Sequence, residues 1–226
     1  MTHIADTIRS IKTQLPPHAK LVAVSKYHPC ESILEAYNAG QRIFGESHAL
    51  EVRDKHQQLP KDIQWHFIGH LQTNKVKYIA PFVTLIHSAD SPRLINEINK
   101  QGIKQNRIIP CLLQLHIAQE ETKYGFTPEE CIAYLESEPW KEFTGVRFAG
   151  CMCMASNVDD EQQIIQEFER AKHTYLYIKE RFFANDPGFC ECSWGMSDDY
   201  PLALQHGSTL VRIGSKIFGQ RTYPSE

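Results

Sequence analysis

The fold is decided by the repeated pattern seen in FVTLIHSADSPRLINEINKQGIKQNRIIPCLLQLHI, residues 82–117. The apolar runs Phe82–Ile86 and Ile108–Ile117 each predict a strand. Between them, Ser91 and Pro92 are typical of a helix start, because serine caps the first turn and proline suits the first helical position. The buried face of this helix is expected from apolar residues at helical spacing, Leu94, Ile95 and Ile98. A helical crossover of this length predicts two parallel strands.

The same alternation runs along the whole chain. Eight short runs predict strands, at Leu21–Val24, Arg42–Phe44, Ile63–Ile68, Phe82–Ile86, Ile108–Ile117, Val146–Met152, Gly188–Ser193 and Thr209–Ile213. Helices are expected between them, with Thr127 starting one and Asp160–Arg181 forming the longest, while Gly40 and Gly102 are expected to end two others. Eight parallel strands favour a closed (β/α)8 barrel of the TIM type over an open sheet. No linker-like composition interrupts the pattern, so we expect one domain over residues 1–226.

The composition limits the partners and the compartment. The chain has 226 residues, 24 Lys and Arg against 27 Asp and Glu, and a net charge of −3, which gives no reason to expect nucleic acid or an anionic membrane. No apolar run is long enough to cross a bilayer. Met1–Ser10 lacks the cationic and apolar parts of a signal peptide. We therefore expect a cytoplasmic protein.

Cysteines and histidines were considered as metal ligands. The pairs Cys151/Cys153 and Cys190/Cys192 each place two thiols on one face of an extended segment, but zinc ligands usually have two residues between them. His66 and His70 are four residues apart, yet Phe67 stands where a helical zinc motif needs glutamate. We expect reduced thiols and no metal, and hydrogen-bonding or stacking roles for the histidines.

The chemistry is expected at the carboxyl ends of the strands, where barrels of this kind carry their sites. Polar residues stand at the ends of the predicted strands repeatedly: Lys26 after the first, Glu46 and Ser47 after the second, His66 and His70 on either side of the end of the third, His87 after the fourth, and His116 closing the fifth. Loops after the seventh and eighth strands often bind phosphate in such barrels. Here these loops are 195–199 (GMSDD) and Gly214–Ser215, whose small and hydroxyl residues suit an anion; two ordinary glycine turns are the alternative.

Lys26 and Arg212 allow two interpretations each. Lys26, after the first strand, is either an exposed, inert lysine or an amine partly desolvated by the barrel mouth and reactive toward an aldehyde. Arg212 stands inside an apolar strand, so it either faces the barrel mouth or forms a structural ion pair with an acid. A lysine and a phosphate cradle at one barrel mouth are what pyridoxal 5′-phosphate (PLP) requires.

Six segments resemble a known family, the PLP homeostasis proteins, also called the YggS/PROSC family. They extend from about residue 21 to residue 214: Leu21–Lys26, Phe44–Glu46, Trp65–Lys75, Ile86–Ser88, Gly195–Asp199 and Gly207–Gly214. The resemblance implies a barrel similar to that of alanine racemase and ornithine decarboxylase.

The resemblance also implies the roles of individual residues. Lys26 is expected to hold PLP as an imine (a Schiff base), and Arg212 to face the pyridine nitrogen. The phosphate is expected at Ser197 with the Met196 backbone, and at Gly214 and Ser215. Two further cofactor-binding positions are expected, His70 and Ser47. The family usually has asparagine where this chain has Ser47, which leaves the contact at that position open.

Three functions are compatible with these features. The favoured one is a PLP-binding homeostasis protein that buffers the cofactor, acts indirectly on amino-acid pools, and has PLP-dependent apo-enzymes as possible recipients. The alternatives are a PLP-dependent racemase or decarboxylase and a barrel enzyme for a phosphorylated metabolite. We expect no catalytic residues, because Arg212 beside the ring nitrogen weakens the ring as an electron sink, and because the chain ends soon after the eighth strand, without the second domain that supplies the opposing base in alanine racemases.

Overall fold

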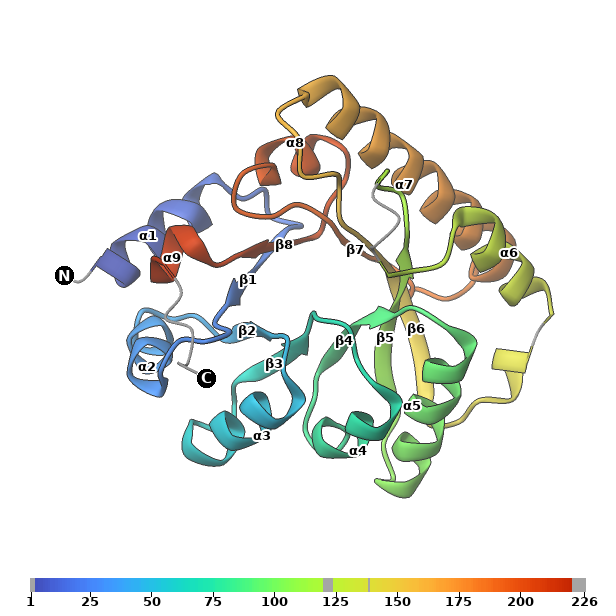
Figure 1. Ribbon diagram of the computed structural model, residues 1–226, viewed down its shortest axis with the longest axis horizontal. Coiled ribbons are helices and arrows are strands. Elements are labelled where there is room, and N and C mark those ends of the chain that lie inside the picture. Colours follow the sequence, from blue (N-terminus) through green and yellow to red (C-terminus); the bar gives the residue numbers. More distant parts are fainter. Residues whose placement is uncertain (1–2, 120–123, 138, 221–226) are drawn as a thin grey trace.

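Eight parallel strands close into a barrel in chain order in the computed structural model, which describes residues 3–119, 124–137 and 139–220 (Figure 1). The strands are β1 Lys20–Val24, β2 Ile43–Glu46, β3 Gln64–Phe67, β4 Leu85–Ala89, β5 Ile109–Leu115, β6 Val146–Cys153, β7 Glu191–Ser193 and β8 Leu210–Ile213. The barrel closes where β8 pairs with β1, with Lys20 opposite Leu210 and Ala23 opposite Ile213. The predicted (β/α)8 barrel is therefore confirmed.

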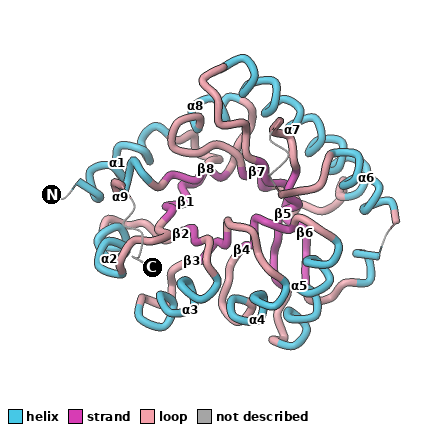
Figure 2. The backbone as a smooth tube through the Cα atoms, in the orientation of Figure 1, coloured by secondary structure: helices cyan, strands magenta, loops and turns pink. Residues whose placement is uncertain are grey.

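Helices surround the barrel on its outside (Figure 2). They are α1 His3–Gln14, α2 Cys30–Asn38, α3 Ala49–Gln58, α4 Val76–Ile79, α5 Pro92–Lys104, α6 Pro128–Glu136, α7 Glu161–Phe182, α8 Tyr200–Gln205 and α9 Ser215–Phe218, with 3-10 turns η1 Thr73–Lys75 and η2 Pro139–Glu142. The expected helix starts are confirmed by their caps. Ser91 Oγ accepts from Leu94 N, and Thr127 forms a capping box with Glu130.

The sequence predicted that Gly102 ends its helix, but the structure shows that it does not. It lies inside α5, which continues to Lys104. A Cβ at Gly102 would lie 1.9 Å from Gly145 O, so the glycine allows the helix to approach the segment before β6. The glycine serves close packing here, not a left-handed helix end.

The fourth strand begins three residues later than predicted. Phe82 and Val83 follow α4 in a turn, and β4 runs from Leu85 to Ala89 with all five residues buried. His87 is therefore inside a strand and not after it, whereas His66 lies inside β3, within the strand predicted for it. Three elements were not predicted at all: α1, which packs against α2 and α9, the short α9 itself, and the 3-10 turn η2.

Two apolar clusters form the core. The larger one fills the space between strands and helices and includes Leu21 and Ala23 of β1. The smaller one takes the alternate residue Val22, with buried side chains from other strands, Leu85, Leu112, Ala149, Met152 and Leu210. Because successive strand residues face opposite sides, the smaller cluster fills the barrel interior.

All seven cysteines lie in the described part of the chain, and none forms a disulfide. Burial raises the pKa of the Cys151 thiol well above its ordinary value, as it does for Cys131, so these thiols stay protonated. No group of three His, Cys, Asp or Glu side chains among the described residues is placed to hold a metal ion. Within the same residues, no helix combines the length and the apolar character that crossing a membrane requires.

Candidate functional site

A cavity of about 920 Å³ opens at the carboxyl ends of the strands. Its wall includes residues that follow β1, β2 and β3 and residues of the loops after β7 and β8. It brings together all eight residues that the sequence proposed for the site: Lys26, Ser47, His70, Met196, Ser197, Arg212, Gly214 and Ser215. Residues far apart in the chain therefore meet around one cavity, as expected for this end of a barrel.

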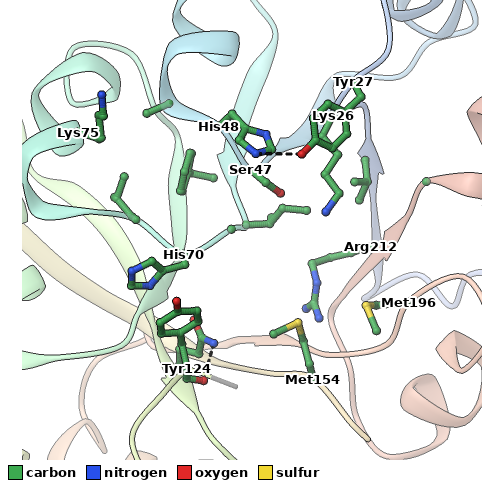
Figure 3. Close-up of a pocket in the computed structure, with 18 of the residues that line it drawn as sticks. Lys26, Tyr27, Ser47, His48, His70, Lys75, Tyr124, Met154, Met196 and Arg212 are labelled. Atoms are coloured by element: carbon green, nitrogen blue, oxygen red, sulfur yellow. Dashed lines mark hydrogen bonds between the residues drawn. The ribbon is translucent and has the colours of Figure 1, made fainter. Parts of the chain in front are cut away.

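Lys26 and Arg212 enter the cavity from adjacent strands. Lys26 comes two residues after the end of β1 and is half-buried, and Arg212 belongs to β8, which pairs with β1. Figure 3 shows the Lys26 amine and the Arg212 guanidinium facing the same opening. The interpretation of Lys26 as an exposed surface lysine does not hold.

Arg212 is buried without a carboxylate partner among the described residues. Its Nη1 donates to Ser193 O at 2.7 Å and to Ser193 Oγ at 2.6 Å, and its Nη2 donates to Cys153 O at 3.0 Å. These three bonds use three of the five N–H groups of a guanidinium and leave two for a ligand. The alternative of a structural ion pair is therefore wrong for the described part of the chain.

A chain of neutral groups continues from Arg212 across the barrel. His87 Nδ1 lies 2.8 Å from Ser193 Oγ, and His66 Nδ1 lies 2.9 Å from His87 Nε2. Because a guanidinium only donates, the Ser193 hydroxyl accepts from Arg212, and its own proton is satisfied by donation to His87. His87 then carries its proton on Nε2 and donates to His66. The prediction that His87 follows its strand at the barrel mouth is wrong: both histidines are buried and do not line the cavity, and His87 supports Arg212 through Ser193.

Both histidines are held uncharged. Burial lowers the pKa of His66 to about 3. Burial, together with the nearby His66 and Arg212, lowers the pKa of His87 well below its ordinary value of 6.5. Neutral imidazoles are what this position allows, since a second cation beside the buried guanidinium would be repelled.

The end of the cavity between β7 and β8 carries the hydroxyls. Ser215 Oγ donates to Ser197 Oγ at 3.2 Å, and Gly214 N lies 3.4 Å from the same oxygen. The Met196 N–H donates to Asp199 Oδ1, so an anion at this N–H would have to displace the carboxylate. Gly195 makes the preceding turn with φ +88, and a Cβ there would lie 2.5 Å from Ala203 Cβ. The glycine is therefore required by both backbone angle and space.

The opposite wall carries Ser47 and His70. His70 Nδ1 lies 2.8 Å from Asp90 Oδ2, and its ring stacks on Tyr124 with centroids 3.8 Å apart. Ser47 packs against Gly69, where a Cβ would lie only 2.6 Å from Ser47 Cβ. The stacking and hydrogen-bonding role expected for His70 is confirmed. Whether either residue touches a ligand stays a prediction.

Glu46 is the last residue of β2 and lies behind the wall, fully buried. Burial raises the pKa of Glu46 to about 7, partly opposed by Lys55, whose ammonium lies 2.8 Å from Glu46 Oε1. Sequence reasoning also missed several wall residues, namely His48, Gln114, Tyr124 and Met154. His48 had a usable signal, because it directly follows Ser47, a residue proposed for the site.

Comparison with known proteins supports one family. Residues 1–222 match the family described as alanine racemase, N-terminal domain. The pyridoxal phosphate homeostasis protein of Aquifex aeolicus is 36% identical over 206 residues, covering 91% of this chain and 88% of that protein. That of Vibrio alginolyticus is 33% identical over 229 residues, covering 98% of this chain and 96% of the relative.

Solved structures agree with the sequence relatives. PipY of Synechococcus elongatus without PLP has a TM-score of 0.89 at 33% identity, covering 96% of this chain and 100% of PipY. PipY with PLP bound has a TM-score of 0.85 at 32% identity over the same shares. Alanine racemase of E. faecalis shares the fold, with a TM-score of 0.76 at 16% identity, and this chain covers 61% of it.

Proposed function

Because this chain belongs to the alanine racemase N-terminal domain family, and within it to the pyridoxal phosphate homeostasis proteins, we propose that it binds PLP and takes part in its homeostasis. The observation that carries the proposal is the meeting of Lys26, Arg212 and Ser197 on one cavity wall. The relative that has been solved with PLP bound supports the choice of ligand. The alternative of a barrel enzyme for a phosphorylated metabolite lacks any such support.

The donor set fits this cofactor. PLP carries an aldehyde, a ring nitrogen and a phosphate. The cavity offers the amine of Lys26, one buried guanidinium with two N–H groups left over, and two neighbouring hydroxyls; a second lysine, Lys75, also lines it. A buried guanidinium is costly without partners, so a ligand acceptor beside it is favourable. Each of the three functional groups of PLP therefore has a suitable partner in the cavity.

Each side chain has a distinct role in this proposal. Lys26 is the amine that condenses with the aldehyde. Arg212 donates to the ring nitrogen, and Ser197 and Ser215, with Gly214 between strand and helix, hold the phosphate. Met196 contributes its N–H once Asp199 has moved from it. His70 and Ser47 form the wall on the other side of the ring.

We further propose that the protein does not turn over amino acids. Bound PLP supplies an electron sink for α-carbon chemistry in enzymes. Arg212 is a permanent cation and donor, so it disfavours protonation of a ring nitrogen beside it and weakens that sink. The groups that could act as a second base are His70, which is paired at Nδ1 with Asp90, and Tyr27, whose Oη lies 3.1 Å from His48 Nε2; the exchange experiment below tests them. The function is then to hold and release the cofactor.

The domain, compartment and recipients belong to the same proposal. Residues 1–226 form one PLP-binding domain, the protein works in the cytoplasm, and PLP-dependent apo-enzymes receive the cofactor. Seven cysteines without a disulfide agree with a reducing compartment.

The first experiment is the visible spectrum of the purified protein with and without added PLP. An imine on Lys26 gives a yellow protein, and borohydride should then fix the cofactor on a peptide that contains Lys26. A colourless protein, or label on another lysine, contradicts the proposal.

The second experiment addresses catalysis. PLP-loaded protein is incubated with L- and D-amino acids in deuterated water, and we expect no α-hydrogen exchange, racemisation or decarboxylation. Turnover on the order of 1 per second or faster, lost in Lys26→Ala, would show an enzyme instead.

The third experiment tests the phosphate end. In Gly214→Val, the new side chain meets Val24 O, which lies 3.1 Å from the Cβ position, so the loop must shift. PLP binding should weaken more than pyridoxal binding, because only PLP carries the phosphate. Equal losses for the two ligands contradict a phosphate role for this loop.

A further inference from the structure

A buried ion group lies directly behind the Lys26 turn. It consists of Glu46, Glu51 and Lys55, from the end of β2 and from α3. The Lys55 ammonium donates to Glu46 Oε1 at 2.8 Å, to Glu51 Oε1 at 2.6 Å and to the carbonyl of Ser25 at 2.8 Å. All three ammonium protons are thus used within the protein, and the Lys55 side chain is only 7% exposed.

Lys26 occupies a tight turn that the chain adopts against its preference. His28 N donates to Ser25 O at 3.1 Å, which closes a four-residue turn over Lys26 and Tyr27. Tyr27 has φ 66, the left-handed value that the third residue of a type II turn requires and that glycine normally provides. A tyrosine in this conformation is strained, so contacts from outside the turn must hold it.

The ion group supplies those contacts on both sides of Lys26. On one side, Ser25 Oγ donates to Glu46 Oε1 at 2.7 Å, and Ser25 O accepts from Lys55. On the other side, Tyr27 N donates to Glu51 Oε1 at 2.7 Å. The backbone before and after Lys26 is therefore fixed by charged groups that do not line the cavity.

We propose that Glu46, Glu51 and Lys55 are positioning residues for Lys26, holding its turn so that the amine meets the aldehyde of PLP. The inference rests on the proposed function. It goes beyond that function by assigning a role to three residues behind the site.

A role in general stability does not explain why this position carries an ion group. Taking Glu46 and Lys55 out of water is costly, and apolar side chains of similar volume often stabilise a protein as well or better. What distinguishes this group is where its hydrogen bonds go, since three of them end on Ser25 and Tyr27. A role in positioning Lys26 explains that choice, whereas general stability does not.

Glu51 is the residue to test, because its side chain is 23% exposed and water can fill the space left by a truncation. Glu51→Ala removes the acceptor for Tyr27 N. Two ligands are compared: PLP, and pyridoxine 5′-phosphate, which has no aldehyde and cannot condense with Lys26. We expect Glu51→Ala to lower the affinity for PLP about tenfold, the effect of losing one hydrogen bond to a charged group. The affinity of Glu51→Ala for pyridoxine 5′-phosphate should stay within about twofold of the wild-type value, a change no larger than that of an ordinary surface substitution.

Two variants accompany it. Glu51→Gln keeps an acceptor at the same place and should restore most of the PLP affinity. Glu191→Ala is the matched control, because Glu191 pairs with Lys20 at 2.7 Å at the opposite end of the same strand β1. It should leave both affinities unchanged.

The outcomes separate the two levels of the argument. Unchanged PLP affinity in Glu51→Ala overturns the positioning role, and so does an equal loss for both ligands, which reports damage to the whole site. If Glu51→Ala does not fold, Lys55→Met is measured in its place with the same two ligands and the same criteria. If the wild-type protein binds pyridoxine 5′-phosphate but forms no imine with PLP, the proposed function itself is overturned.

Discussion

The two sides of the cavity are supported by polar networks of opposite character. Behind Lys26 the network is ionic, with two carboxylates around one ammonium. Behind Arg212 it is neutral, a serine and two uncharged histidines that follow one another in a line. Both networks are buried, and both end on a residue of the cavity wall.

The difference follows from the group that each network serves. Arg212 brings its own charge, cannot lose its proton, and needs acceptors that add no second cation, which neutral imidazoles and a hydroxyl provide. Lys26 sits in a strained turn, and strong charge-assisted bonds to the backbone hold that turn. One network therefore fixes a side chain, and the other fixes a piece of backbone.

The largest effect is expected from removing the amine on the ionic side. Lys26→Ala leaves Arg212 and the hydroxyls of Ser197 and Ser215 in place, so PLP should still bind, weakly and without an imine. The visible band and all borohydride-fixed label should disappear, while equilibrium dialysis still detects bound PLP. Label that persists on another residue of the cavity would show that Lys26 is not the attachment point.

The neutral side is broken most directly at Ser193. Ser193→Ala leaves His87 Nδ1 and one Arg212 N–H without their partner, which should cost about 1–3 kcal/mol of unfolding free energy in urea. Ser88→Ala is the matched control, because Ser88 directly follows His87 in β4. Ser88 is equally buried, and its hydroxyl has no hydrogen-bond partner among the described residues, so its loss should not destabilise the protein. Equal effects of the two variants contradict the network.

The pH response of stability should have opposite signs on the two sides. Burial raises the pKa of Glu46 from 4.5 to about 7, so between these values the folded protein keeps a proton that the unfolded chain has lost, and stability falls as pH rises. Burial lowers the pKa of His66 from 6.5 to about 3, so between these values only the unfolded chain binds the proton, and stability falls as pH falls.

Glu46→Gln isolates the ionic side. Relative to the wild type, its unfolding free energy should rise with pH between 4.5 and 7, by up to about 1.4 kcal/mol per pH unit. His66→Gln should do the reverse and flatten the loss of stability toward acid pH. Denaturation curves at several pH values measure both slopes. If the Glu46→Gln curve runs parallel to that of the wild type, Glu46 does not titrate in this range.

The sequence predicted the wall of the cavity better than what lies behind it. The barrel and its strand ends placed Lys26, Ser197 and Gly214 at one opening, because the ends of parallel strands meet there whatever the exact strand limits are. The supporting histidines depended on those limits. Phe82 and Val83 extended the apolar run before β4, and the shift of three residues moved His87 from a loop into a buried strand.

The hydrogen-bond partners could not be predicted from the chain alone. Ser193 meets His87 across 106 positions, and this contact exists only once the barrel has closed. Glu51 and Lys55 are the exception, since carboxylate and ammonium four residues apart on a helix form a pair by spacing alone. Their further bonds to Ser25 and Tyr27 again required the fold.

The smallest effect concerns Ser47, where the resemblance to the family leads one to expect asparagine. Figure 3 shows the Ser47 hydroxyl directed toward the opening that the Lys26 amine faces. Gly69 restricts the space on its other side, where a Cβ would lie 2.6 Å from Ser47 Cβ, so a longer side chain extends into the cavity. Ser47→Asn should therefore gain one neutral hydrogen bond to PLP and raise the affinity by at most about tenfold. Ser47→Ala, measured by the same titration, should change the affinity less, because the short hydroxyl does not reach the ring. If alanine loses affinity while asparagine gains none, the serine hydroxyl already makes the contact, and the wall formed by His70 and Ser47 binds the cofactor as well as the two sides that carry Lys26 and Arg212.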